Sequence, residues 1–254
     1  MLELAAAAMG AGAMNAVAGG GTLLTFPTLI LVGVGPERAN ATSTLALVFG
    51  TFGSIYGYRE HMPAIRSWLA RFSLVSAIGG LAGAWLLTHT TDSTFGRMVP
   101  FLILFATLLF MAQNAFRRLA DKERQHKGHG PGAVWGALAF QLAVATYGGF
   151  FGAGIGILML ASLGFLGMTN IHEMNALKTV LGSLINAVAT VWFIGAGLID
   201  WPVAAIMTVG AVIGYYVTAR YAQSISQRRV RQLIALIGFG ISGVMFYKQF
   251  IRHG

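Results

Sequence analysis

The chain has 254 residues, of which 56% are hydrophobic and only 10% are charged, and its mean hydropathy is +0.70. Because a soluble domain usually carries about 25% charged residues, this composition excludes a water-soluble globular protein and predicts a polytopic membrane protein in contact with lipid. Cys is absent, which excludes disulfides, and the net charge of +9 does not indicate nucleic-acid binding, since the basic residues lie between apolar segments.

Apolar segments long enough to enter or cross a bilayer recur along the whole chain. We expect about eight helical membrane segments, at residues 2–32, 41–58, 69–89, 98–116, 133–167, 174–197, 202–221 and 231–250. The longest polar stretch, 117–132, is basic and predicts a cytoplasmic loop. This loop would separate a first transmembrane repeat, 1–116, from a second, 133–254.

The two halves resemble each other at an offset of 135 residues. AGGGTLL at 18–24 aligns with AGIGILM at 153–159, and NATST at 40–44 aligns with NALKT at 175–179. Internal repeats are the usual architecture of secondary transporters. The pattern predicts an all-α protein built from two repeats of four hydrophobic segments each.

The first segment of each half is unusually long and contains glycines midway. Each segment is either one long tilted helix or two half-helices that meet inside the membrane. The glycines at the two candidate tips include Gly19, Gly20, Gly21, Gly152, Gly154 and Gly156. Re-entrant segments place twelve Lys and Arg on one side and four on the other, whereas spanning segments give ten and six. The positive-inside rule favours re-entrant segments, and the two repeats are then inverted.

Lys178 lies inside the apolar stretch 174–197. A charge at the centre of a membrane helix costs about 2.5–3.5 kcal/mol on insertion scales. One alternative is that the side chain extends to the interface or pairs with Glu173, although i, i+5 is a poor helical spacing. The other is that Lys178 binds a substrate or counter-ion, the default hypothesis for an intramembrane charge.

Uncharged polar residues accompany Lys178. Asn175, Thr179 and Asn186 fall on roughly one helix face, with Lys178 beside it. The matching stretch of the first half supplies Asn40, Thr42, Ser43 and Thr44. Amides, hydroxyls and one cation suit a small oxyanion, and helix starts at the glycine tips would add N–H groups. Alternatively, the hydroxyls bond to their own helices and the glycines only allow close helix packing.

Catalytic and metal-binding patterns are weak. The acidic and His residues lie at segment ends or in loops, and no P-loop motif is present. We therefore expect no enzyme activity, no cofactor and no metal. His172 and Glu173 are candidates for proton coupling because they precede the Lys178 stretch, although both also suit an ordinary helix start.

Several motifs resemble the sulfite exporter TauE/SafE family of bacterial membrane proteins. They are NAVAGGGTLLTFPTLILVGVGPERANATS at 15–43, its weaker copy at 148–179, GLIDWP at 197–202 and GAVIGYYVTARYA at 210–222. The resemblance covers nearly the whole chain and implies about eight membrane segments and export of sulfite or small organosulfur anions. The family's Ala-x-x-Thr-Ser pattern falls on Ala39, Thr42 and Ser43, but Leu177 and Lys178 replace the Thr-Ser pair in the second half.

Together these features predict a multi-pass protein of the bacterial inner membrane. We expect a secondary transporter that exports a small oxyanion, sulfite or a small organosulfonate, by alternating access coupled to the proton gradient. Its partners would be the anion and membrane lipids, with a homodimer as an open option. An anion channel and a non-transporting membrane scaffold are the alternatives.

Overall fold

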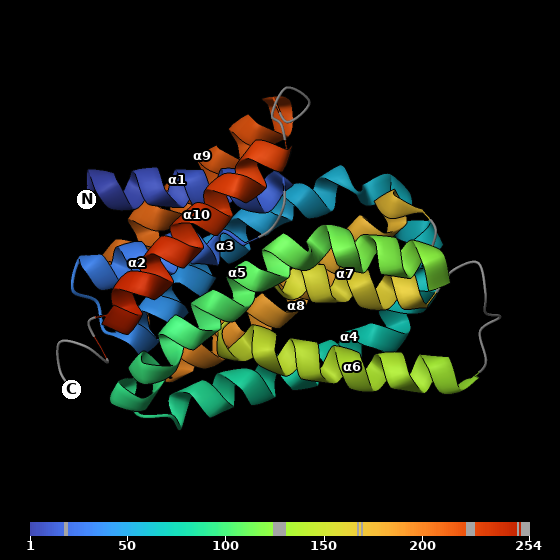
Figure 1. The fold of residues 1–254 in the computed structure, drawn as a ribbon, viewed down its shortest axis with the longest axis horizontal. Coiled ribbons are helices and arrows are strands. Elements are labelled where there is room, and N and C mark those ends of the chain that lie inside the picture. Colours follow the sequence, from blue (N-terminus) through green and yellow to red (C-terminus); the bar gives the residue numbers. More distant parts are fainter. Residues whose placement is uncertain are drawn as a thin grey trace.

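The computed structural model describes residues 1–17, 20–123, 131–166, 168, 170–221, 227–247 and 249. These residues form ten α-helices and one short 3-10 helix, as the sequence predicts for an all-α protein. The helices are α1 (Leu2–Val17), α2 (Thr22–Leu31), α3 (Pro36–Gly57), η1 (Arg59–His61), α4 (Met62–Thr88), α5 (Asp92–Glu123), α6 (Pro131–Phe150), α7 (Ile155–Phe165), α8 (Ile171–Gly195), α9 (Trp201–Tyr221) and α10 (Gln227–Phe246). They pack into one elongated bundle (Figure 1).

Four stretches of the described residues are long and apolar enough to cross a membrane. They are Arg59–Thr88, Asp92–Ala112, Ile171–Gly195 and Trp201–Thr218. Shorter apolar helices are Thr22–Leu31, Val134–Phe150, Ile155–Gly164 and Ala235–Phe246. The molecule is therefore a polytopic α-helical membrane protein, and within its described residues fewer segments have full spanning length than the eight that hydropathy predicts.

Helix ends follow local sequence signals. Helices α3 and α6 begin at Pro36 and Pro131. Proline suits this position, because the first N–H of a helix makes no intrahelical hydrogen bond and its absence costs nothing. The side chain of Asn170 caps α8 by accepting from the N–H groups of His172 and Glu173. Asp200 caps α9, because its carboxylate accepts from the N–H of Val203 at 3.3 Å.

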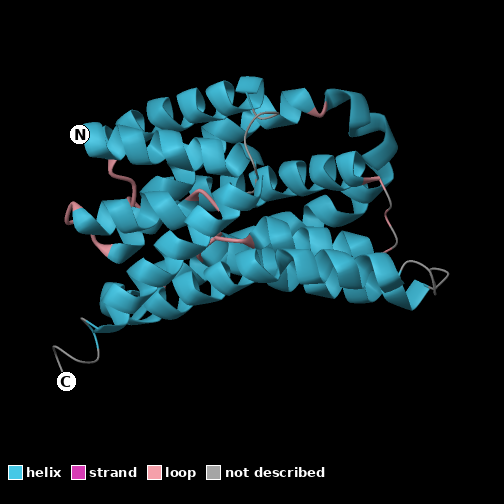
Figure 2. Cartoon of the chain, turned by 45° about the horizontal axis from the view of Figure 1, so that its top comes forward, coloured by secondary structure: helices cyan, strands magenta, loops and turns pink. Residues whose placement is uncertain are grey.

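Each of the two long first segments is divided into two helices. The first breaks between α1 and α2 at Gly20, which has φ of 91°, and the second between α6 and α7 at Gly152 and Gly154, which both have φ of 82°. Glycine adopts this left-handed backbone without the steric cost of a side chain. The two-helix interpretation of these segments is confirmed, and each pair folds back as a hairpin (Figures 1 and 2).

The two hairpins open toward opposite ends of the bundle (Figure 1). One end of the bundle is called the Asp200 end. A hollow there is bordered by Met1, Val34, Arg38 and Asp200, which shows that α1, α2, α3 and α9 all have an end on this side. At the other, called the His172 end, the rings of His61 and His172 stack at 5.5 Å. The outer part of the α6–α7 hairpin packs there, since Leu163 and Met168 cluster with Ile65.

Close contacts at glycine hold the hairpins in the bundle. A Cβ atom added to Gly149 of α6 would overlap the backbone of Gly80 on α4. A Cβ atom added to Gly214 of α9 would likewise overlap the backbone of Met9 on α1. Small residues allow membrane helices to approach this closely, so α6 is fixed against α4 and α1 against α9.

Helix α5 continues to Glu123. Residues 117–123, which the sequence analysis assigns to a loop, are therefore helical. Residues 124–130 lie outside the described part of the chain.

Candidate functional site

The tips of the two hairpins meet beside α3, α8 and α9 and border a cavity of about 110 Å³. Both tips, the middle of α8 and two turns of α3 contribute to its wall. The lining residues are Asn15, Gly20, Thr22, Leu47, Thr51, Gly152, Gly154, Ile155, Gly156, Met159, Lys178, Thr179, Gly182, Ser183, Asn186 and Tyr215. The cavity is therefore made from residues of both halves of the chain.

Two helices begin at this cavity. Helix α2 starts at Thr22 and α7 at Ile155, and both residues line the cavity wall. The N–H groups of Leu23 and Leu24 at the start of α2 and of Ile157 at the start of α7 already donate to the carbonyls of Gly20, Gly21 and Gly154. The attraction for an anion at these helix starts therefore comes mainly from the helix dipole, which places partial positive charge there. Two helix starts at one small cavity favour an anion as its occupant.

Lys178 is the charged residue among those that line the cavity. Its aliphatic stem packs on the first turn of α7, so that a Cβ atom added to Gly156 would lie 3.1 Å from Cδ of Lys178. In the described residues no carboxylate forms an ion pair with Lys178. Glu173, the candidate partner from the sequence, instead accepts from the side-chain amide of Asn170 at 2.9 Å. The positive charge therefore faces the cavity without a neutralising partner.

The uncharged polar groups of the cavity divide into free and occupied ones. Asn15 accepts from the N–H of Gly21 at 2.7 Å through its side-chain oxygen, and its side chain also hydrogen bonds to Tyr215. Ser183 and Thr51 donate their hydroxyls to carbonyls of their own helices, at 2.8 and 2.6 Å. Asn186 lines the wall opposite Gly152. The amide of Asn186 thus supplements Lys178 and the two helix starts.

The size and chemistry of the cavity select its ligands. Sites for drug-sized molecules and cofactors measure about 300–1,000 Å³, so 110 Å³ suits only a very small ligand. Its donors and its single charge are those that bind oxyanions. The described residues contain no group of three or more His, Cys, Asp or Glu able to hold a metal ion.

The structure brings together one group of the residues singled out from the sequence. This group lies around the cavity and consists of Gly20, Gly152, Gly154, Gly156, Lys178, Thr179 and Asn186. Gly21 lies immediately behind the wall, bonded to Asn15. Gly19 lies outside the described residues.

The polar candidates from the first half lie away from the cavity wall and are bonded elsewhere. Asn40 donates to the carbonyl of Phe150 at 3.0 Å, and Thr42 accepts from the N–H of Asp200 at 3.1 Å. Ser43 is hydrogen bonded to Thr25 of α2, and Thr44 donates to the carbonyl of Asn40. Asn40, Thr42 and Ser43 thus hold α3 against its neighbours, whereas the bond of Thr44 lies within α3.

Three candidates of the second half also lie off the cavity. Asn175 donates to the carbonyl of Ile171 at 2.9 Å, within its own helix. His172 and Glu173 sit at the capped start of α8, where His172 stacks on His61. The face predicted from Asn175, Thr179 and Asn186 is thus only partly a cavity face.

Sequence reasoning missed Asn15, Thr22 and Tyr215. Asn15 is a polar residue in an apolar segment a few positions before the glycines, which is a signal the sequence does contain. Tyr215 lies on α9 far along the chain, and its ring occupies the space above Gly50 of α3. No local pattern places Tyr215 at the cavity, because only the packing of α9 on α3 does so.

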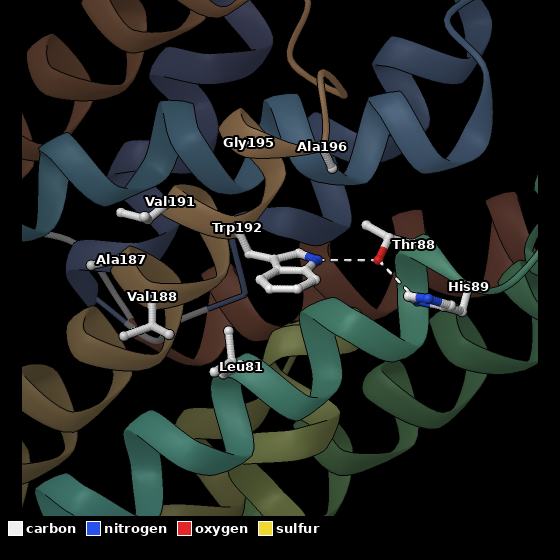
Figure 3. Close-up of a pocket in the computed structure, with 9 residues that line it drawn as sticks. All are labelled: Leu81, Thr88, His89, Ala187, Val188, Val191, Trp192, Gly195 and Ala196. Atoms are coloured by element: carbon white, nitrogen blue, oxygen red, sulfur yellow. Dashed lines mark hydrogen bonds between the residues drawn. The ribbon is translucent and has the colours of Figure 1, made fainter.

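A larger hollow of about 730 Å³ lies between α4 and α8 (Figure 3). Its wall is mainly apolar, and Val191 on its rim is 71% exposed, as expected for a surface that meets lipid. Its polar groups already bond to one another, since Trp192 Nε1 donates to Thr88 Oγ1 at 3.1 Å. The hollow offers little to bind an anion.

Comparisons with known proteins agree on the class of molecule. A family model described as "Sulfite exporter TauE/SafE" matches residues 4–245. The chain is 30% identical over 244 residues to a "Probable membrane transporter protein" of Haemophilus influenzae, covering 93% of this chain and 90% of that protein. It is 26% identical over 245 residues to "Probable membrane transporter protein YfcA" of Escherichia coli strain K12, covering 94% and 87%. No solved structure gives a significant match.

Proposed function

The chain belongs to the sulfite exporter TauE/SafE family, and from this premise we propose that it exports a small oxyanion, sulfite or a small organosulfonate, across the bacterial inner membrane. Its relatives are named membrane transporters, so the protein itself is a membrane transporter and not an enzyme. The observation that carries the substrate proposal is the 110 Å³ cavity in which two helix starts and the unpaired Lys178 converge.

The proposed mechanism is alternating access by two inverted repeats. The two broken segments enter the bundle from opposite ends and meet at the cavity (Figure 1). Broken helices with their N-termini at a midplane site are characteristic of inverted-repeat transporters. We assign the His172 end to the cytoplasm by the positive-inside rule. Arg59 lies in η1, and Arg66 and Arg71 lie near the start of α4, all toward that end. Rocking of one repeat against the other would expose the cavity to each side in turn.

Proton coupling is proposed at the His172 end. His172 and Glu173 begin α8, the helix that carries Lys178, and His172 is stacked on His61 of the link between α3 and α4. Protonation of either ring would change the contact between this link and α8. A proton bound there would bias the position of α8 without entering the cavity.

The test is flux of radiolabelled sulfite and sulfoacetate in proteoliposomes, measured at two imposed pH gradients. A carrier gives saturable flux and counterflow, in which unlabelled anion on one side drives uptake of labelled anion from the other. Flux that changes with the pH gradient at a constant membrane potential supports coupling to protons.

Two outcomes favour the alternatives. Flux that does not saturate and shows no counterflow indicates an anion channel, because a channel needs no occluded site. Absence of flux for both anions, with the protein folded and inserted, rejects sulfite and sulfoacetate as substrates and supports a non-transporting scaffold.

A further inference from the structure

Two buried polar atoms in the described residues lack a hydrogen-bond partner. They are Asn40 Oδ1 and Thr190 Oγ1. Their residues are only 1% and 7% exposed. A buried polar atom without a partner destabilises the fold, and such atoms are few in native proteins. Of the two atoms, only the Thr190 hydroxyl can donate to an anion, because Asn40 Oδ1 is an amide oxygen that accepts; the donor of Asn40 is its NH₂ group.

Thr190 continues the cavity face of α8. Thr179, Ser183, Asn186 and Thr190 follow one another at steps of four, three and four residues, which places them on one helix face. The first three line the cavity. Because α8 runs from the His172 end to the Asp200 end, Thr190 lies beyond the cavity toward the Asp200 end (Figure 1).

Asn40 continues the cavity face of α3 in the same direction. Asn40, Thr44, Leu47 and Thr51 have the same spacing of four, three and four residues. Leu47 and Thr51 line the cavity. Helix α3 runs opposite to α8 and packs against it, so Asn40 also lies between the cavity and the Asp200 end (Figure 1).

An aromatic cluster packs next to the cavity, between α2, α5 and the tip of the α6–α7 hairpin. Phe26 of α2, Phe95 of α5 and Phe150 and Phe151 at the tip of the α6–α7 hairpin form it. Ring centroids lie 5.4 Å apart for Phe26 and Phe151 and 5.4 Å apart for Phe95 and Phe150. The side-chain amide of Asn40 donates to the carbonyl of Phe150 at 3.0 Å. Asn40 therefore ties α3 to the hairpin tip that carries half of the cluster.

We propose that the anion leaves the cavity between α3 and α8, and that Asn40 and Thr190 contact it on the way to the Asp200 end. In the conformation described here, the aromatic cluster and the bond from Asn40 to Phe150 close this route. Movement of the hairpin tip frees the amide of Asn40, which then donates to the passing anion together with the hydroxyl of Thr190. The inference rests on the proposed transport function and adds its exit route.

The natural absence of Cys makes the route directly testable. Thr190→Cys and Asn40→Cys would be labelled in proteoliposomes with a membrane-impermeant thiol reagent, with and without sulfite counterflow. Ala189→Cys is the matched control for Thr190→Cys, because Ala189 is the fully buried neighbour on the same helix but on another face. Ala39→Cys is the corresponding control on α3.

We expect both test positions to react at least about tenfold faster during counterflow, while the two control positions stay protected. If Asn40→Cys does not fold, Thr190→Cys alone tests the proposal. The Thr190 hydroxyl makes no hydrogen bond in the described structure, so this replacement breaks none. Equal labelling of Thr190→Cys and Ala189→Cys under both conditions overturns the proposal.

A second measurement separates the exit route from the cavity itself. Thr190→Val keeps the side-chain shape but removes the hydroxyl, so maximal flux should fall roughly tenfold while sulfite binding stays unchanged. Thr190→Ser should restore the flux. Flux unchanged in Thr190→Val rejects the route, whereas failure of wild-type sulfite flux and counterflow rejects the proposed sulfite export on which the route rests.

Discussion

Replacing Lys178 with Met separates the function of this residue from its effect on stability. Lys178 lies seven residues after Ile171, so at about 1.5 Å per residue it is about 10 Å along α8. A charge costs free energy at such a depth, and no ion pair offsets it in the described structure. Met has a similar length and no charge, so the variant leaves no orphaned counter-charge. We therefore expect Lys178→Met to be at least as heat-stable in detergent as the wild type.

The same replacement should weaken anion binding. It removes one charged hydrogen-bond donor from the cavity, an interaction that contributes about 1.5–3 kcal/mol. That range corresponds to roughly a 10- to 150-fold rise in the sulfite Kd. The two helix starts remain, which explains why residual binding is expected.

The assay is sulfite binding by isothermal titration calorimetry, paired with thermal unfolding of the same samples. Asn175→Ala is the matched control, because Asn175 lies one turn earlier on α8 and bonds to Ile171 instead of lining the cavity. The control should bind sulfite like the wild type. Wild-type affinity in Lys178→Met would refute the anion site, and lost affinity accompanied by a lowered unfolding temperature would show a structural role for Lys178.

Two further predictions concern packing. Gly149→Ala should destabilise the protein by about 1–3 kcal/mol, because the new methyl group would overlap the backbone of Gly80. Gly136→Ala on the same helix meets nothing within 4 Å and should not lower the unfolding temperature, so equal unfolding temperatures for the two variants would contradict this reasoning. Trp192→Phe loses the hydrogen bond to Thr88 and should cost about 0.5–1.5 kcal/mol, whereas combining it with Thr88→Val should add little. Full additivity of these two changes would indicate that the bond does not contribute.

Several features of the protein follow from sequence because their causes are local. Hydropathy predicts membrane helices, and Gly20, Gly152 and Gly154 predict the two breaks, since only glycine adopts the left-handed backbone there at no steric cost. Asn170 and Asp200 cap α8 and α9 in the structure, and Asn and Asp are residues that local chemistry favours at a helix start. Lys178 stands out because a lone charge in an apolar segment is costly.

The candidate site was only partly predictable, because Asn and Thr residues can bind a ligand or bond to the backbone with the same sequence signal. Asn186 and Thr179 reach the cavity, whereas Asn175, on the same helix, bonds to Ile171. Repeat symmetry made Asn40 the counterpart of Asn175, but Asn40 bonds to Phe150 of the opposite hairpin.

The sequence alone thus determined the membrane class and the position of the intramembrane charge and favoured the helical breaks, since each depends on neighbouring residues. Only the tertiary structure decided which residues share the cavity. Asn15, Lys178 and Tyr215 come from three helices distant in sequence, and long-range packing alone brings them together. That packing depends on close backbone contacts such as those of Gly149 and Gly214, whose partners no local pattern identifies.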